Sequence, residues 1–145
     1  MTKEKFNKDK VIKILNKLLE HEYAGVVRYS HFSLMVFGFN RIPIVKWLRD
    51  QATESLRHAE EIGEHITTLG GHPSLKLSAL LETHKHSVKD ILHEALEHEE
   101  EQIETFHSLL SEVEGKSVYL EEFTRGMIEE EMIHTSEIEK MLRQS

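Results

Sequence analysis

The sequence predicts an all-α fold, a bundle of four long helices in which one long crossover joins the second helix to the third. Two observations predict this fold. Apolar residues recur with helical spacing along most of the chain, and no segment alternates apolar and polar residues as a strand would. Glycine and proline are scarce, with 7 and 2 in 145 residues, and predict helix breaks at residues 38–43, 70–73 and 115. At this length we expect one domain over residues 1–145.

The breaks divide the chain into four segments with helical periodicity. Pro43 suits the first turn of the second helix, because proline lacks the N–H that a first turn leaves unbonded. Ser87 and Asp90 resemble a capping box at the start of the third helix, and Ser117 is the expected N-cap of the fourth. The expected helices cover residues 7–37, 43–69, 87–114 and 117–142.

The lengths of the links predict the topology. The first and third links have only a few residues, so each pair of helices that they join must be antiparallel. The second link, residues 70–86, is long enough to run the full length of the bundle, so the second and third helices can be parallel. Four leucines could pack part of this crossover as a short helix: Leu75, Leu77, Leu80 and Leu81.

Composition excludes several classes of protein. The chain has no cysteine, which excludes disulfides, thiolate zinc sites and iron–sulfur clusters. A formal net charge of −8 makes a nucleic-acid partner unlikely, although residues 3–10 carry four lysines. No stretch approaches a membrane span and residues 1–10 lack an apolar signal region, so we expect a cytoplasmic protein without a membrane partner.

Acidic and histidine side chains occur on the apolar face of every expected helix. Glu131 and His134 lie three residues apart, about one helical turn, in phase with the apolar residues around them. A bare carboxylate in a core costs several kcal/mol unless a cation meets it. The candidate metal ligands chosen by this phase are Glu22, Glu54, His58, Glu99, Glu131 and His134.

Depth along the bundle supports a common site. Glu22 and Glu99 each lie 16 residues before the glycine that follows their helix, so both reach mid-height. Carboxylate and imidazole groups suit iron or manganese, and four carboxylates would neutralise two divalent ions. Zinc remains an alternative. A metal-free ion-pair network is another alternative, with Arg28 and Arg57 as the nearest cations. Glu104-x-x-His107 repeats the spacing but points away from this face.

The motifs resemble the bacterioferritin family of ferritin-like di-iron carboxylate proteins. Residues 15–22 resemble its first-helix signature, and Tyr29 falls where the family keeps a tyrosine beside the metals. The pair at residues 58–59 resembles its second-helix motif, and Glu131-x-x-His134 resembles its fourth-helix motif. The resemblance covers all four helices and implies a ferritin-like four-helix bundle with a long crossover.

By this resemblance, Glu131 bridges two irons, one bound by Glu22 and His58 and the other by Glu99 and His134. The resemblance also implies Fe(II) oxidation by O₂ or peroxide, with Tyr29 as a neighbour that is either redox-active or only packed there. The leading hypothesis is therefore a ferroxidase for iron storage or detoxification. The alternatives are a di-iron peroxidase or oxygenase of the rubrerythrin-like branch, and a non-catalytic metal-binding subunit for assembly or DNA protection.

Three departures from the family pattern change the expectations. The family's glutamate three residues before the second-helix histidine is Ser55 here. If Glu54 cannot replace it, the expected site is lopsided, weak in one ion, or limited to one iron instead of two. The haem-ligating methionine falls at Leu56, so no haem is expected. The sequence ends at Ser145 without a fifth helix, which puts a closed cage in doubt.

The resemblance implies a homo-oligomer, at least a dimer. Long amphipathic helices make such a dimer easy to build. We expect the apolar residues near the first turn to be exposed, and either to form an interface or to cap the core. These residues are Val36, Phe37, Phe39 and Ile42.

Overall fold

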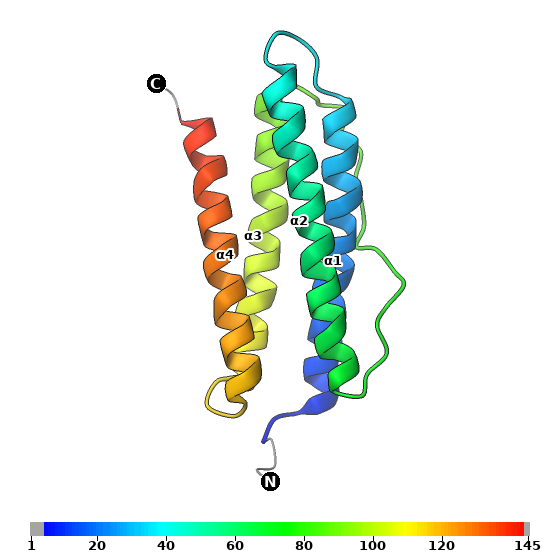
Figure 1. Ribbon diagram of the computed structural model, residues 1–145, viewed down its shortest axis with the longest axis vertical. Coiled ribbons are helices and arrows are strands. Elements are labelled where there is room, and N and C mark those ends of the chain that lie inside the picture. Colours follow the sequence, from blue (N-terminus) through cyan, green and yellow to red (C-terminus); the bar gives the residue numbers. More distant parts are fainter. Residues whose placement is uncertain (1–4, 144–145) are drawn as a thin grey trace.

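The computed structural model describes residues 5–143 and confirms the all-α prediction (Figure 1). Four long helices stand side by side and, within these residues, no strand is present. They are α1 (Lys8–Leu34), α2 (Arg41–Thr68), α3 (Val88–Val113) and α4 (Val118–Leu142). Helix α2 runs antiparallel to α1, and α3 runs in the same direction as α2, as the link lengths predict (Figure 1).

The helix starts follow the predicted caps. The hydroxyl of Ser87 accepts a hydrogen bond from the backbone N–H of Asp90 at 3.0 Å, and Ser117 accepts one from Leu120 at 3.3 Å. Both N-cap predictions are therefore confirmed, and the Asp90 carboxylate accepts from the Ser87 hydroxyl at 2.8 Å rather than from the backbone N–H of a full capping box.

The first turn between helices departs from the predicted bounds. Helix α1 ends at Leu34 rather than at residue 37, and α2 begins at Arg41, two residues before Pro43. Gly38 adopts φ +104°, which only glycine tolerates well, and it reverses the chain between the two helices. The guanidinium of Arg41 donates to the carbonyl of Val36 at 2.6 Å and so binds the end of α1 to the start of α2.

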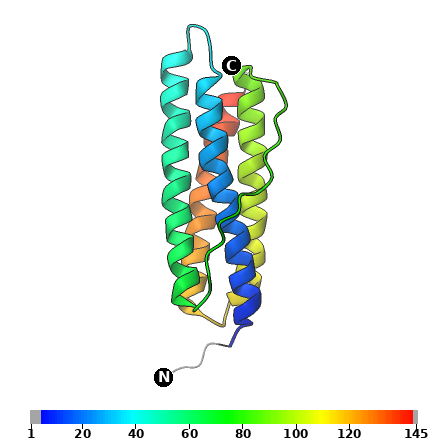
Figure 2. The same cartoon turned by 90° about the vertical axis from the view of Figure 1, so that its right-hand side faces the viewer.

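The crossover is extended and contains no helix, so the expected short helix was wrong (Figure 2). Leu75 and Leu81 have exposed fractions of 94% and 77%, and therefore do not pack as the expectation required. The segment lies along α1, where Asn16 accepts from the backbone N–H of Ser74 at 2.8 Å. A second attachment is the backbone bond from Ser78 to Glu20 at 3.1 Å.

Two apolar clusters fill the bundle, one toward each end. One cluster is built around Leu15, Ile62 and Phe106, and the other around Tyr29, Leu48 and Ile91. On every helix the buried glutamate and histidine residues fall between the positions that belong to the two clusters. These buried acidic and histidine groups are thus concentrated in one layer near mid-height.

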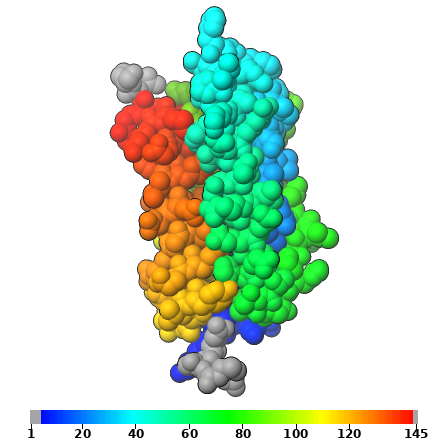
Figure 3. All heavy atoms as spheres, viewed as in Figure 1, coloured from blue at the N-terminus to red at the C-terminus, as the bar shows by residue number. Residues whose placement is uncertain are grey.

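The helices do not all approach each other equally. Pairs of Cα atoms within 8 Å join α1 to α2, α3 to α4 and α1 to α3, whereas none joins α2 to α4 in the described residues. Side chains close the face between α2 and α4 instead (Figure 3). The polar layer spans this wider gap, where His58 of α2 lies 3.3 Å from Glu131 of α4.

The surface near the first turn is only partly as expected. Phe37, Phe39 and Ile42 are exposed, but Val36 is 1% exposed and belongs to the core, so its expected exposure was wrong. Val36 packs in the same cluster as Tyr29 and Phe32. None of the helices in residues 5–143 is both long and apolar enough to cross a membrane.

Candidate metal centre

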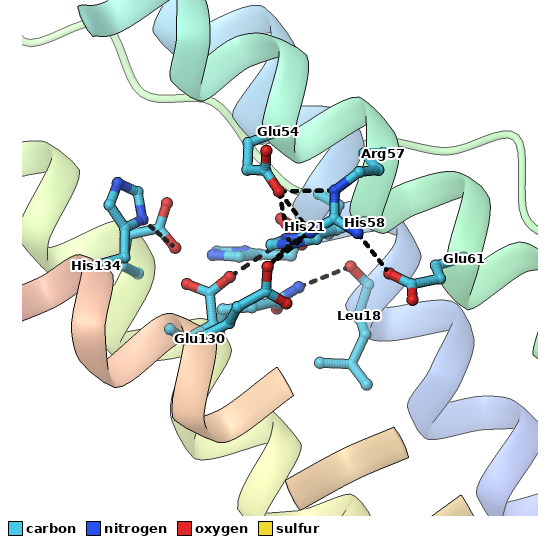
Figure 4. Close-up of polar contacts among 12 residues, drawn as sticks. Leu18, His21, Glu54, Arg57, His58, Glu61, Glu130 and His134 are labelled. Atoms are coloured by element: carbon cyan, nitrogen blue, oxygen red, sulfur yellow. Dashed lines mark hydrogen bonds and ion pairs between the residues drawn. The ribbon is translucent and has the colours of Figure 1, made fainter. Parts of the chain in front are cut away.

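All six predicted ligands lie at the height of the polar layer, although not equally deep. Helix α1 supplies Glu22, α2 supplies Glu54 and His58, α3 supplies Glu99, and α4 supplies Glu131 and His134. Figure 4 shows His134 on the opposite side of the layer from His58 and Glu54. The side chains with at most 6% exposure are Glu22, His58, Glu99 and Glu131, whereas that of His134 is 20% exposed and that of Glu54 is 46% exposed.

Glu22, His58 and Glu131 form the first group. Nδ1 of His58 lies 3.0 Å from a carboxylate oxygen of Glu22 and 3.3 Å from one of Glu131. One ligand atom from each of the three lies within 4.8 Å of the others, which is close enough for a shared metal ion.

Glu99, Glu131 and His134 form the second group, again with ligand atoms within 4.8 Å of one another. Nδ1 of His134 lies 3.7 Å from Oε2 of Glu99. The other oxygen of Glu99, Oε1, accepts a hydrogen bond of 2.7 Å from the phenol of Tyr29, which is fully buried. Tyr29 therefore lies beside this group, as the resemblance implied.

Glu131 belongs to both groups. Its Oε2 is buried and has no hydrogen-bond partner among the described residues, and the same holds for Nε2 of His134. Buried acceptors are nearly always satisfied in folded proteins, so these atoms are consistent with ligands for an added cation. The residues present thus fit a centre of two metal ions with a shared carboxylate.

A third group lies on the outer edge of the His58 ring. Nε2 of His58 faces Glu54 at 3.5 Å and Glu130 at 3.6 Å, on the edge away from Glu22 and Glu131. Arg57 lies between these carboxylates, donating to Glu54 at 2.7 Å and to Glu130 at 2.6 Å (Figure 4). Glu54 therefore reaches His58 but is paired with Arg57 rather than directed into the layer.

The carboxyl groups have strongly divergent proton affinities. Burial, followed by the charge of Glu99, raises the pKa of Glu131 well above its ordinary value. Burial also raises the pKa of Glu22, from 4.5 to about 7, although His58 opposes this rise. For Glu99 burial acts in the same direction, but contacts with Glu131 and His134 outweigh it and hold the pKa below 4.5. Without metal, the layer therefore keeps a proton on Glu131 and leaves Glu99 ionised.

Histidine and tyrosine respond to the same charges. Burial acts to lower the pKa of His58, but hydrogen bonding to Glu131 and Glu22 overcomes it and raises the pKa from 6.5 to about 11. Burial and the charge of Glu99 raise the pKa of Tyr29 well above 10, so the phenol stays protonated and remains a donor. The imidazolium of His58 thus takes part of the role that a metal cation would have.

His98 is a buried residue of this layer that the sequence did not single out. Its ring stacks on His21 with centroids 3.9 Å apart, and neither ring nitrogen has a partner among the described residues. Burial lowers the pKa of His98 to about 3, so the ring is neutral. A side chain on Gly25 would meet both Nε2 of His98 and Oγ of Ser55, which explains glycine there. His98 lies within a Glu-rich run whose helical phase favoured only Glu99.

The metal-free ion-pair alternative lacks a lysine or arginine at the buried carboxylates. Arg57 pairs with three half-exposed carboxylates, those of Glu54, Glu61 and Glu130. Within residues 5–143, no lysine or arginine forms an ion pair with Glu22, Glu99 or Glu131, and Nε of Arg28 has no partner. Among the described residues, histidine is the only basic residue type that faces the three buried carboxylates.

Comparison with solved structures finds the same fold in several bacterial proteins. A ferritin-like, diiron-carboxylate protein from Bacillus anthracis strain Ames has a TM-score of 0.88 at 24% identity, over 94% of this chain and 97% of that chain. A dodecameric thioferritin from Bacteroides fragilis, a bacterioferritin-related protein, has a TM-score of 0.84 at 21% identity, over 95% and 87%. The bacterioferritin of Desulfovibrio desulfuricans has a TM-score of 0.84 at 24% identity, over 93% and 79%.

Sequence comparison gives the family directly. A search of the curated proteins found no significant match to this chain. The profile of the Ferritin-like domain family, however, matches residues 12–145, which include every residue of the polar layer and all four helices except the first four residues of α1. With the four-helix topology and the buried carboxylate–histidine layer, this match shows that the chain belongs to the ferritin-like domain family.

Proposed function

We propose that the polar layer binds two Fe(II) ions as substrate and supports their oxidation, for iron storage or detoxification. The observation that carries the proposal is the position of Glu131, which belongs to two groups of possible ligands at once. Glu22 and His58 complete the group around one ion, and Glu99 and His134 complete the group around the other. The diiron-carboxylate relative from Bacillus anthracis supports iron as the metal.

The donor set suits this chemistry. Carboxylate oxygens and imidazole nitrogens bind iron in both oxidation states, and a bridging carboxylate keeps two ions close enough to react together. Each Fe(II) loses one electron, so a pair reduces O₂ with two protons to hydrogen peroxide, or reduces peroxide with two protons to water. Manganese and zinc would fit the same donors, and metal analysis distinguishes them.

The protein's own groups orient these ligands. With a neutral His58, an Nε2–H directed at Glu54 or Glu130 would leave Nδ1 free to accept a metal beside Glu22 and Glu131. Glu54 then acts through His58 rather than as a sixth ligand, and Tyr29 fixes one oxygen of Glu99 by hydrogen bonding. Such a centre has three carboxylates, so its two irons would carry one more positive charge than a four-carboxylate centre and bind less tightly.

The sequence and the comparisons also support proposals about haem binding and about assembly. We propose that the chain binds no haem at Leu56, because an apolar side chain there supplies no ligand for haem iron. We also propose a cytoplasmic homo-oligomer. The dodecameric thioferritin from Bacteroides fragilis supports assembly, and the exposed Phe37, Phe39 and Ile42 offer apolar surface for it.

Anaerobic Fe(II) titration followed by oxygen addition tests the proposal. The unmodified chain should bind up to two Fe(II) per subunit and consume O₂ as they oxidise, with native mass measured on the same sample. Glu131→Gln keeps the size of the side chain but removes a shared negative charge, so oxidation should slow at least tenfold. Glu129→Gln, on the exposed side of the same helix, is the matched control and should oxidise iron at the parental rate.

Two results would contradict the proposal. One is a chain that binds no iron, or binds it and leaves it Fe(II) after exposure to both O₂ and peroxide. The other is a Glu131→Gln variant whose iron stoichiometry and oxidation rate equal those of Glu129→Gln. Faster oxidation by peroxide than by O₂, with turnover on an external reductant and no mineral, would instead favour the peroxidase alternative.

A further inference from the structure

A second cluster of possible ligands lies away from the polar layer, where the crossover reaches the end of α1. His31, on the last turns of α1, faces Glu82 and His86 of the crossover. One ligand atom from each of the three lies within 4.8 Å of the others. We propose that these residues form a separate surface site for a divalent first-row transition ion, with Zn²⁺ as the ion that fits best.

The distances agree with a common ion. Nε2 of His31 lies 2.8 Å from Oε2 of Glu82, and Nε2 of His86 lies 3.3 Å from Oε1 of the same carboxylate. Donor atoms about 2.1 Å from a tetrahedral ion stand roughly 3.4 Å apart, so the three side chains need only small rotations to share one. The centroids of the two imidazoles are 5.6 Å apart, which leaves an ion room between their nitrogens.

The carboxylate of Glu82 is held in place for this role. Its Oε1 accepts a hydrogen bond of 2.7 Å from the backbone N–H of His84, and this bond first, then contact with His31, lowers its pKa. His84 adopts φ +58°, a conformation in which histidine is tolerated better than most residues. The bend directs the backbone N–H of His84 at Glu82, while the His84 side chain stays outside the group of three.

The chemistry of the donors selects the ion. Two imidazole nitrogens and one carboxylate oxygen suit Zn²⁺ and its neighbours, whereas Ca²⁺ and Mg²⁺ prefer sites made only of oxygen. The side chains of His31 and Glu82 are 44% and 40% exposed, so an ion can enter without opening the bundle. A cleft of about 200 Å³ beside them, lined also by Phe32 and Leu80, leaves room for a water as fourth ligand.

An ion at this position would fasten the crossover to α1. The described crossover has no regular structure, and its backbone attachments to α1 lie nearer the N-terminus of that helix, at Asn16 and Glu20. His31 belongs to α1 and Glu82 to the crossover, 51 residues apart in sequence, so a shared ion would join these two segments directly. The site depends on none of the ligands proposed for the central layer.

Zn²⁺ titration of the metal-free, unmodified chain tests the site. Long-range ¹H–¹⁵N spectra of the histidine rings should show the Nε2 resonances of His31 and His86 moving as Zn²⁺ is added. The variant carrying both His31→Asn and His86→Asn should retain about one Zn²⁺ per chain less than the parent after desalting. His107→Asn, an exposed histidine of α3 outside any cluster, is the matched control and should retain as much as the parent.

Fixed Nε2 resonances of His31 and His86 through a full Zn²⁺ titration would overturn the proposal, and this measurement requires no substitution. Equal retained zinc in the parent and in the doubly substituted variant would overturn it as well. Fe(II) oxidation at the central layer should be the same in all three proteins, because none of the three substituted histidines belongs to it.

Discussion

When two carboxylates are buried side by side, one of them keeps a proton until a cation replaces that proton. Glu131 is such a group, and its helical phase was enough to predict from the sequence that it is buried. Helical phase did not predict that Glu54 pairs with Arg57, because phase gives the direction of a side chain and not its partners. It also missed His98, since a histidine beside a ligand glutamate in a Glu-rich run gives no signal of its own.

Glu22 makes the stability of the metal-free protein depend on pH. Its pKa is about 7 in the folded state and 4.5 as an ordinary glutamate, so between these values the folded chain binds more protons than the unfolded chain. Stability therefore falls as pH rises from 5 to 8, by on the order of 3 kcal/mol at about 1.4 kcal/mol for each tenfold change in proton affinity. His58 acts in the same direction above pH 6.5, and Glu99 is ionised throughout.

Thermal unfolding of chelator-treated protein between pH 5 and 8 checks this expectation. Glu22→Gln cannot ionise and should remove the part of the dependence that Glu22 contributes, leaving the slope that Glu131 and His58 contribute. The exposed Glu129→Gln should leave the dependence unchanged. A parental melting temperature that rises over this range would show that Glu22 is ionised in the metal-free fold.

At the scale of elements, the sequence predicted all four helices and their directions, because periodicity and link length are local signals. The end of α1 and the start of α2 differed from the predicted bounds by three and two residues, because the turn depends on the contact between Arg41 and Val36. The prediction of a short helix in the crossover was wrong for another reason. Four leucines do not make a helix where no neighbouring surface buries them, and Leu75 and Leu81 face solvent.

Arg57 joins α2 to α4 on the face where their backbones stand apart. Its Nη2 lies 3.1 Å from Nε2 of His58 and donates to Glu130, so it places a positive charge beside a proposed ligand. Arg57→Gln should raise Fe(II) affinity about threefold to tenfold, because repulsion between Arg57 and the bound cation is removed. The loss of stability should stay below about 1 kcal/mol, since these ion pairs are half exposed.

Fe(II) titration and denaturant unfolding measure the two effects separately. Arg125→Gln is the matched control, because Arg125 also bridges two carboxylates on the surface, Glu114 and Glu121, but lies outside the polar layer. Its iron affinity should equal that of the parent. A lower affinity in Arg57→Gln would mean that Arg57 serves mainly to hold Glu54 and Glu130 in position.

At the scale of the whole molecule, the polar layer separates two apolar clusters and joins two helical hairpins. Sequence patterns predicted the layer's height because residues at equal depth can be counted from the helix ends. They could not predict that α2 and α4 would lack close backbone contact, which follows from packing across the bundle. Glu22 and His58 come from one hairpin and Glu99, Glu131 and His134 from the other, so a metal ion bound by Glu22, His58 and Glu131 would link the hairpins directly.

Metal binding should therefore stabilise the entire bundle rather than one helix. A free metal concentration 100 times the dissociation constant adds about 2.7 kcal/mol, which for a chain of 145 residues corresponds to a rise in melting temperature of roughly 5–10 °C. Amide exchange should slow on the facing sides of α2 and α4, where side chains alone close the bundle. Glu131→Gln should lose most of this rise, while the His31→Asn, His86→Asn variant should keep it when Fe(II) is the ligand. Protection confined to α4 alone would contradict a link between hairpins, because an ion held by one hairpin cannot restrain the other.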